Sequence, residues 1–214
     1  MENKVKLKDI PKGKKLSYIM DYYWVHMLAA AAVVAVAWIM IANIRNYQEP
    51  LLELIMINTY KSEQEQEQVV RDFLQENGYE VFDTAVAVDT DIRFGVNAQS
   101  DAYSTNQLMT TTVAGEGDLY FWTGEEFEPY IEKGALEDLR NYLPEELLAK
   151  LEDRLYYTTL GDEVEAYPCG IDLKGNSWAK EHGYINGGLV GISRGVKNTE
   201  AAVKLLTYIV NMSL

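Results

Sequence analysis

The chain has 214 residues, of which 48% are hydrophobic and 24% are charged, a composition that supports a compact core and excludes global disorder. Residues 1–45 carry a net charge of +4, whereas residues 46–214 contain 12 basic and 30 acidic residues and carry a net charge of −18. Such an acidic surface repels phosphates, so we expect no nucleic-acid partner, although the acidity need reflect no more than solubility. The single cysteine, Cys169, excludes an intrachain disulfide and a cysteine-rich metal site.

The first apolar segment indicates a membrane anchor. Residues 22–44 contain no Asp, Glu, Lys or Arg, and as a helix they would span about 30 Å, the thickness of a hydrocarbon core. A secretory signal has a shorter apolar region followed by a small-residue cleavage site. Here the small residues at 29–32 lie in the middle of the segment, so an uncleaved signal-anchor is favoured over a cleaved signal.

The lysines predict the orientation of this anchor. Lys4, Lys6, Lys8, Lys12, Lys14 and Lys15 all precede the apolar segment. The positive-inside rule then places residues 1–21 in the cytoplasm as a basic tail, with 22–44 spanning the cell membrane, 45–50 as a linker and 51–214 as an extracytoplasmic domain. This arrangement suggests a bacterial, Gram-positive-like envelope. A single spanning helix offers no transport pathway, so the function is expected to reside in the domain outside.

Within that domain, apolar runs alternate with helical periodicity. Strands are predicted at 51–60, 81–90, 118–123 and 187–193, and helices at 61–80, 99–114, 124–139, 143–157 and 199–212, with an extended segment or hairpin at 162–172. Ser62 and Thr199 are the expected N-caps of their helices, and Gly78 is placed to end the first of them. Strands that alternate with helices predict a three-layer α/β domain with a mainly parallel sheet.

Three segments carry a family resemblance. The stretch "NQLMTTTVAGEGDLYFWTGEEFEPYIEKGALEDL" resembles a recurring segment of extracellular solute-binding proteins of the type 2 periplasmic-binding fold. The matching parts are the turn at 114–117, the strand at 118–122 with its initial acid, and the Gly-x-Leu-x-x-Leu pattern at 134–139. "EVEAYPCGID" and "LVGISRGVKNTEAAVKLLTYIV" resemble two further segments of this family.

The resemblance implies one lobe of a fold that usually has two. Only the stretch "LKGNSWAKEHGYINGG" lies between the predicted hairpin and the apolar part of the last strand, and a second lobe does not fit in that length. We therefore expect a one-lobed, membrane-anchored variant. Since the family binds solutes between two lobes, two-sided enclosure of a small ligand is in question here.

A surviving ligand site is expected at the carboxyl ends of the strands, where helix N-termini and backbone groups face a cleft. The candidate residues are Asn58, Thr59, Tyr60, Trp122, Thr123, Gly124, Gly170, Asp172 and Trp178. Aromatic faces beside amides and hydroxyls suit a sugar- or peptide-like solute. The alternative interpretation is that Trp122 and Trp178 are packing residues.

No pattern points to catalysis. Cys169, His182 and Asp172 supply the residue types of a thiol dyad without a nucleophile signature around them. The sequence 89–91 resembles the start of a calcium loop but lacks its glycine and closing glutamate, so no metal site and no cofactor are expected. Two hypotheses remain: a non-catalytic binding protein for a small polar solute, acting as an accessory to a transporter, or an envelope protein-interaction module that has lost its solute site.

Overall fold

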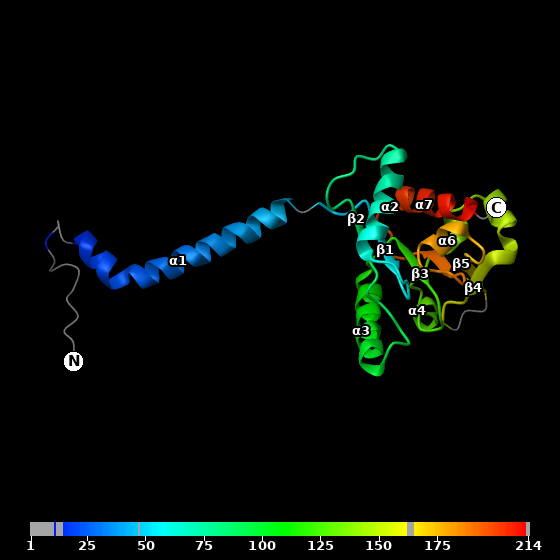
Figure 1. Cartoon of the computed structure of the whole chain (residues 1–214), viewed down its shortest axis with the longest axis horizontal. Coiled ribbons are helices and arrows are strands. Elements are labelled where there is room, and N and C mark those ends of the chain that lie inside the picture. The colour runs from blue at the N-terminus through cyan, green and yellow to red at the C-terminus, as the bar shows by residue number, and fades with distance from the viewer. Residues whose placement is uncertain (1–10, 12–14, 47, 162–164, 213–214) are drawn as a thin grey trace. The chain divides into compact units, whose positions relative to one another are not determined.

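The structure, a computed structural model, describes residues 11, 15–46, 48–161 and 165–212 (Figure 1). The chain divides into two compact units, Met1–Gln48 and Glu49–Leu214, and their boundary falls within the predicted linker. Most of the predicted tail at 1–21 lies outside the described residues.

The apolar segment belongs to helix α1 (Lys15–Asn46). Its stretch Trp24–Ala42, 19 residues long, is apolar enough to cross a membrane, and none of this stretch is buried within the structure. Such an N-terminal helix suits a membrane anchor or a signal sequence. Helix α1 is longer than the predicted span at 22–44, because it also includes residues 15–21 before the apolar segment and residues 45–46 after it.

The second unit is built on one sheet of six strands, in the order β2-β1-β3-β6-β5-β4. The strands are β1 (Leu52–Met56), β2 (Val86–Asp89), β3 (Leu119–Trp122), β4 (Leu155–Thr158), β5 (Tyr167–Asp172) and β6 (Leu189–Ile192). β1 pairs in parallel with β2 and β3, whereas the pairs β3–β6, β6–β5 and β5–β4 are antiparallel. The α/β class is confirmed, and the sheet is mixed rather than mainly parallel.

The antiparallel pairing of β4 with β5 has a simple cause. Residues 159–166 join β4 to β5, and a parallel pairing would need a crossover of about a dozen residues or more. The predicted helix at 143–157 is correspondingly too long. The observed helix ends at Lys150. The Leu-Tyr-Tyr-Thr stretch at 155–158 forms β4 instead, because aromatic residues favour a pleated strand.

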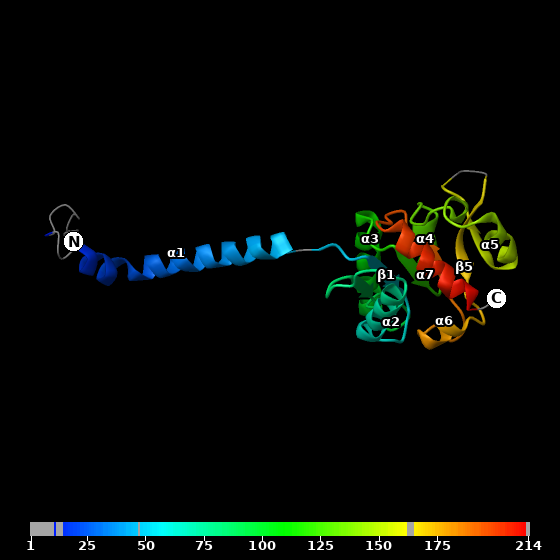
Figure 2. The same cartoon turned by 90° about the horizontal axis from the view of Figure 1, so that it is seen from above.

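Helices cover both faces of the sheet, giving the predicted three layers (Figure 1; Figure 2). They are α2 (Glu63–Glu76), α3 (Ala98–Ala114), α4 (Glu128–Ile131), α5 (Glu145–Lys150), α6 (Ser177–Glu181) and α7 (Thr199–Asn211), with the 3-10 helices η3 (Leu139–Asn141) and η4 (Glu152–Arg154). α2, α6 and α7 pack on one face and α3 and α4 on the other. The predicted helix at 124–139 is reduced to α4 with its flanking turns, because the chain turns at Gly134 with φ +84°.

Local capping signals explain where the longer helices begin and end. Ser62 and Glu65 form a capping box at the start of α2, and Gly78, with φ +81°, follows its end. α3 begins after Asn97 and ends at Gly115 in the left-handed conformation. The N-cap of α7 is Asn198, one residue ahead of the predicted Thr199, because the Asn198 side chain accepts from the Ala201 amide.

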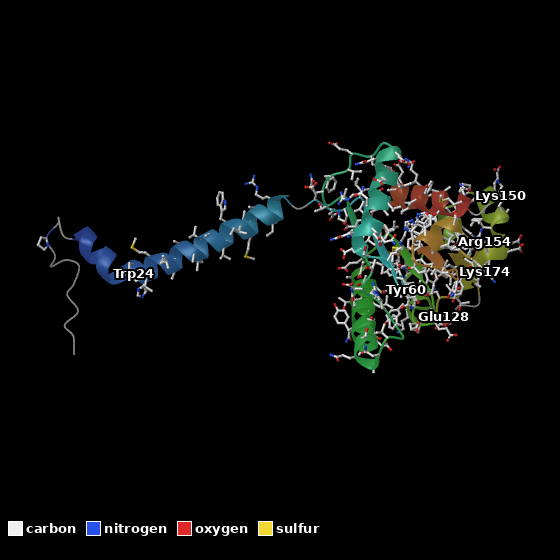
Figure 3. The ribbon with its side chains drawn as sticks, in the orientation of Figure 1. Trp24, Tyr60, Glu128, Lys150, Arg154 and Lys174 are labelled. Atoms are coloured by element: carbon white, nitrogen blue, oxygen red, sulfur yellow. The ribbon has the colours of Figure 1, made fainter. Side chains whose placement is uncertain are left out.

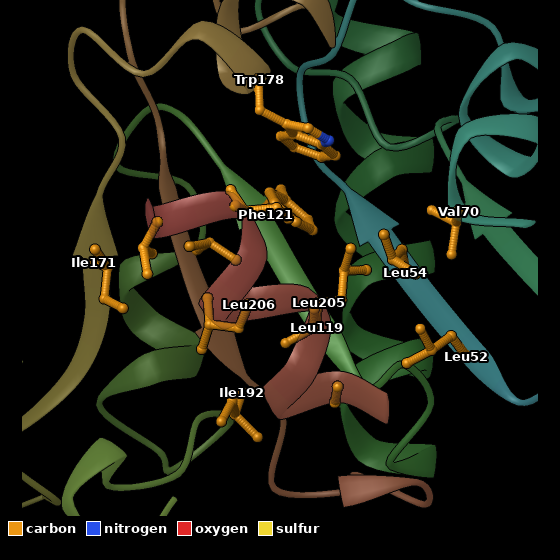
Figure 4. Packing of buried hydrophobic residues seen from close by; sticks show 14 of the residues in the cluster. Leu52, Leu54, Val70, Leu119, Phe121, Ile171, Trp178, Ile192, Leu205 and Leu206 are labelled. Carbon is orange, nitrogen blue, oxygen red and sulfur yellow. The ribbon is translucent and has the colours of Figure 1, made fainter. Parts of the chain in front are cut away.

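Two hydrophobic clusters lie on the two faces of the sheet. The larger joins β1, β3, β5 and β6 to α2, α6 and α7, and Figure 4 shows Leu205 and Leu206 facing Leu119 and Ile192. The smaller cluster packs Tyr120, Trp122 and Phe127 with α3 and α4. Both clusters lie wholly within Glu49–Leu214, so this unit has a complete core of its own and can fold without α1.

Candidate functional site

The candidate site lies at the edge of the sheet where β1, β2, β3 and β5 have their carboxyl ends. β2 and β3 flank β1, and α2 and α3, which lead to them, cover opposite faces of the sheet. The sheet therefore has a topological switch point between β1 and β3. In open α/β sheets, ligands bind in the crevice outside such a point.

Asn58 ties the strand ends together at this switch point. Its Nδ2 donates to the carbonyl oxygen of Thr123 at 3.0 Å, and its Oδ1 accepts from the amide of Phe94 at 2.7 Å. Its backbone lies in the left-handed region with φ 60°, which asparagine tolerates better than most residues. The amide predicted to bind ligand is therefore engaged within the protein.

The loop between α6 and β6 closes the crevice. Tyr184, 2% exposed, donates its hydroxyl to the carbonyl oxygen of Ile57 at 3.1 Å and also lies 3.4 Å from that of Phe121. The Thr59 hydroxyl donates to the carbonyl oxygen of His182 at 2.9 Å. Side chains of this chain thus fill the place where a ligand is expected, while Tyr60 is 82% exposed.

The two candidate tryptophans lie on opposite faces of the sheet and do not meet. Trp178 belongs to the larger cluster, where its ring lies 5.2 Å from Phe121 and 4.1 Å from His182, measured between centroids (Figure 4). Trp122 belongs to the smaller cluster, with its ring edge-on to Phe127. Both are buried, as the packing interpretation expects, so neither presents an open ring face to a sugar.

Gly170 serves the packing of Trp122. A Cβ atom at Gly170 would lie 2.9 Å from Cη2 of the Trp122 indole, closer than real contacts allow. The absence of a side chain at Gly170 therefore lets the indole of β3 reach β5. The structure brings these two predicted residues together, and their contact is one of packing.

An open cleft of about 400 Å³ remains at the same edge, displaced from the switch point toward β5 and β4. Its lining comes from strand ends and adjoining turns: Trp122, Thr123, Gly124, Asp153, Arg154, Leu155, Tyr156, Asp172, Gly187, Gly188 and Leu189. Four of the predicted residues, Trp122, Thr123, Gly124 and Asp172, are among them. Arg154, labelled in Figure 3, marks the β4–β5 end of the sheet.

The cleft holds charges of both signs beside exposed backbone. Arg154 Nε donates to the carbonyl oxygen of Asp172 at 3.0 Å, and the Asp172 carboxylate accepts from the amide of Lys174 at 2.8 Å. Burial raises the pKa of Tyr156, whose hydroxyl therefore stays protonated at neutral pH. These groups offer hydrogen-bond donors and acceptors to a polar ligand.

Cys169 and His182 do not form a pair. Cys169 lies in the smaller cluster with its Sγ 3.7 Å from the carbonyl oxygen of Tyr156, and burial raises its pKa to about 12. His182 Nδ1 lies 2.6 Å from Oε1 of Gln66 in the layer of α2 and α6. Among the described residues, no three His, Cys, Asp or Glu side chains are grouped to hold a metal ion.

Sequence reasoning missed Arg154, the Gly187–Gly188 pair and Tyr184. The two adjacent glycines before β6 were a usable signal, since a Cβ at Gly188 would lie 2.9 Å from the Tyr184 ring. Arg154 gave no signal, because it was assigned to a helix that does not extend so far.

No protein-family model, curated protein or solved structure matches the chain in comparisons with known proteins. The function is therefore inferred from the residues and their geometry alone.

Proposed function

We propose that this protein is a single-pass membrane protein whose unit Glu49–Leu214 lies outside the cytoplasm and binds a small polar solute without catalysis. The single observation that carries the proposal is that Thr123 and Gly124, which follow β3, and Asp172, at the end of β5, line one cleft at the carboxyl edge of the sheet.

The location follows from the first unit. α1 contains an apolar stretch of 19 residues, and the lysine-rich tail precedes it in the sequence. The positive-inside rule favours a cytoplasmic N-terminus, with the acidic unit on the other side of the cell membrane. An uncleaved anchor would keep the binding domain at the membrane.

The ligand class follows from the cleft. A volume of about 400 Å³ suits a small molecule. Because the indole of Trp122 is buried, the polar groups of the cleft determine which ligand binds. Arg154 and Asp172 offer opposite charges, which favours an amino acid or short peptide over a neutral sugar. The resemblance to one lobe of a type 2 periplasmic-binding protein agrees with this proposal, and a transporter would be the partner that uses the bound solute.

Thermal melts of Glu49–Leu214 against amino acids, short peptides and sugars test this proposal. A ligand at about a hundred times its dissociation constant adds about 2.7 kcal/mol, a rise of several degrees in Tm. Thr123→Val and Asp172→Asn should each reduce the rise. Trp122→Ala is unsuitable, because removing a fully buried indole costs about 3–5 kcal/mol.

Asp83→Asn is the matched control, since Asp83 is exposed, lies before β2 and makes no side-chain hydrogen bond or ion pair with the described residues. An equal loss of the shift in this variant would assign the effect to overall charge. A panel without any shift would reject solute binding at this cleft.

A second candidate, a protein-interaction module, is favoured by α3. Its outer face exposes Tyr103, Met109 and Val113 to 63%, 50% and 84%. Exposed apolar side chains that are grouped mark interaction sites more often than single ones. Crosslinking from Tyr103→Cys in intact membranes would detect a protein partner there, and an absence of crosslinks would count against this candidate.

A further inference from the structure

A larger cavity lies at the opposite edge of the same sheet. It occupies about 630 Å³ between the end of α3, the turn after α4 and the end of β6. β3 begins at this edge and β6 ends there, since Leu119 pairs with Ile192. We call this cavity the α3–β6 groove. It is separate from the cleft at the other ends of these strands, so binding in the groove does not depend on the proposed function.

Bare backbone forms one wall of the groove. The turn after β6 passes Gly115 so closely that a Cβ on Gly195 would overlap the Gly115 carbonyl group. Two side-chain-free positions therefore give the groove its depth.

Arg194 lies at the rim of the groove, with its guanidinium group resting on Gly134. A Cβ on Gly134 would lie 2.8 Å from Cζ and from both Nη atoms. The other described arginines of Glu49–Leu214 donate to carbonyl or carboxylate oxygens, namely Arg71, Arg93, Arg140 and Arg154. Within the described residues, Arg194 has no side-chain hydrogen bond or ion pair.

Lys133 lines the same groove, and no described Asp or Glu does. This absence is unusual in a unit with 30 acidic and 12 basic residues after position 45. Glu137, Asp138 and Glu165 line the neighbouring cleft, which Arg194 also lines, and there Asp138 pairs with Arg140. The groove is thus a positively charged site in an acidic domain, which favours an anionic ligand.

The remaining lining is largely apolar. Met109 and Val113 come from α3, and the aromatic rings of Tyr120 and Tyr130 complete the wall. A volume of about 630 Å³ falls within the range of small-molecule sites. A ligand that matches both the apolar lining and the positively charged rim has an apolar body and an anionic end.

We propose that the α3–β6 groove binds an amphipathic carboxylate, with its apolar chain against Met109, Val113 and Tyr130 and its carboxylate at Arg194 and Lys133. A guanidinium group that lies on a glycine and makes no side-chain hydrogen bond or ion pair with the described residues can bind a carboxylate with two parallel hydrogen bonds.

Octanoate is the probe, titrated into ¹⁵N-labelled Glu49–Leu214, whose own core allows work without lipid or detergent. We expect saturable shifts of the amides of Val113, Gly134 and Gly195, with a dissociation constant of about 1 mM or tighter. Octan-1-ol, which has the same chain without the charge, should bind about tenfold more weakly.

Arg194→Gln and Lys133→Gln should each weaken octanoate about three- to tenfold and leave octan-1-ol unchanged. Both side chains are exposed and make no side-chain hydrogen bond with the described residues, so folding should persist, as circular dichroism would verify. Lys180→Gln, an exposed lysine on α6, is the matched control and should leave the affinity unchanged. The proposal is overturned by equal affinities for octanoate and octan-1-ol, by an equal loss in the control, or by the absence of saturable shifts at the groove.

Discussion

The Tyr184 hydroxyl donates a hydrogen bond to the carbonyl oxygen of Ile57, a residue 127 positions earlier in the chain, at the switch point of the sheet. The Tyr184 side chain thereby occupies the crevice in which open α/β sheets bind their ligands. It also explains why the remaining cleft lies closer to β5 and β4. Tyr184 therefore affects both the position of the open cleft and the stability of this edge of the sheet.

Tyr184→Phe removes the buried hydroxyl and leaves the carbonyl oxygen of Ile57 without that donor. We expect a loss of about 0.5–1.5 kcal/mol in the free energy of unfolding, measured by urea denaturation. Tyr60→Phe is the control, because Tyr60 is 82% exposed and its hydroxyl is free to bond to water. Equal midpoints for Tyr184→Phe and the unaltered protein would contradict the role assigned to this bond.

Asp118→Asn should destabilise the start of β3. The buried Asp118 carboxylate accepts from the amide of Glu53 at 2.8 Å and from that of Lys197 at 2.7 Å, joining β1 to the segment before α7. Asparagine keeps only one acceptor oxygen, so one of these two part-buried amides loses its partner, at about 1–3 kcal/mol. The same urea measurement on Asp83→Asn supplies the baseline, and similar losses in both variants would refute this explanation.

His182 should make stability depend on pH. Burial lowers its pKa, with Lys61 acting in the same direction and Glu181 opposing it. Since the unfolded state, with a pKa of about 6.5, then binds the proton more readily, stability should fall as pH decreases through and below about 6.5. Above that range the imidazole is neutral in both states and contributes no slope.

The test is urea denaturation of Glu49–Leu214 between pH 5 and 8, a unit in which His182 is the single histidine. His182→Asn should abolish the part of the slope near pH 6, which for one group is at most about 1.4 kcal/mol per pH unit. An unchanged slope in the variant would assign the dependence to carboxylates instead.

Cys169 should resist labelling in the folded protein. Its side chain is fully buried, and burial raises its pKa to about 12, so almost no thiolate exists at pH 8. A maleimide should react slowly with the native protein and rapidly in urea, and mass spectrometry follows the single site directly. Rapid labelling without denaturant would show that β5 opens under native conditions.

Several elements could be predicted from the sequence because they depend on local physics. Ser62 and Gly78 delimit α2 through hydrogen bonds and dihedral angles set within a few residues. The apolar runs at 51–60 and 118–123 contain β1 and β3, since their continuous hydrophobicity suits strands buried on both faces. The sequence also predicted that Thr123, Gly124 and Asp172 lie near one another, because strand ends meet at one edge, and the three residues line one cleft.

Other features could not be predicted, because they depend on which strands pair. The Leu-Tyr-Tyr-Thr stretch of β4 follows a helical pattern in the sequence and becomes a strand only beside β5. Trp122 and Trp178 look equivalent in the sequence, and the face that each occupies is fixed by the sheet. Arg194 and Gly134 gave no sign of contact, since they meet only after β6 and α4 have packed.

By itself, the sequence determined the apolar N-terminal segment, the α/β class and the two ends of α2, because hydrophobic runs and capping bonds act over a few neighbouring residues. Only the tertiary structure decided the mixed sheet, the closure of the switch point by Tyr184, and the positions of the cleft and the α3–β6 groove. These features join residues far apart in the chain, and their contacts become favourable only when the whole core is buried together.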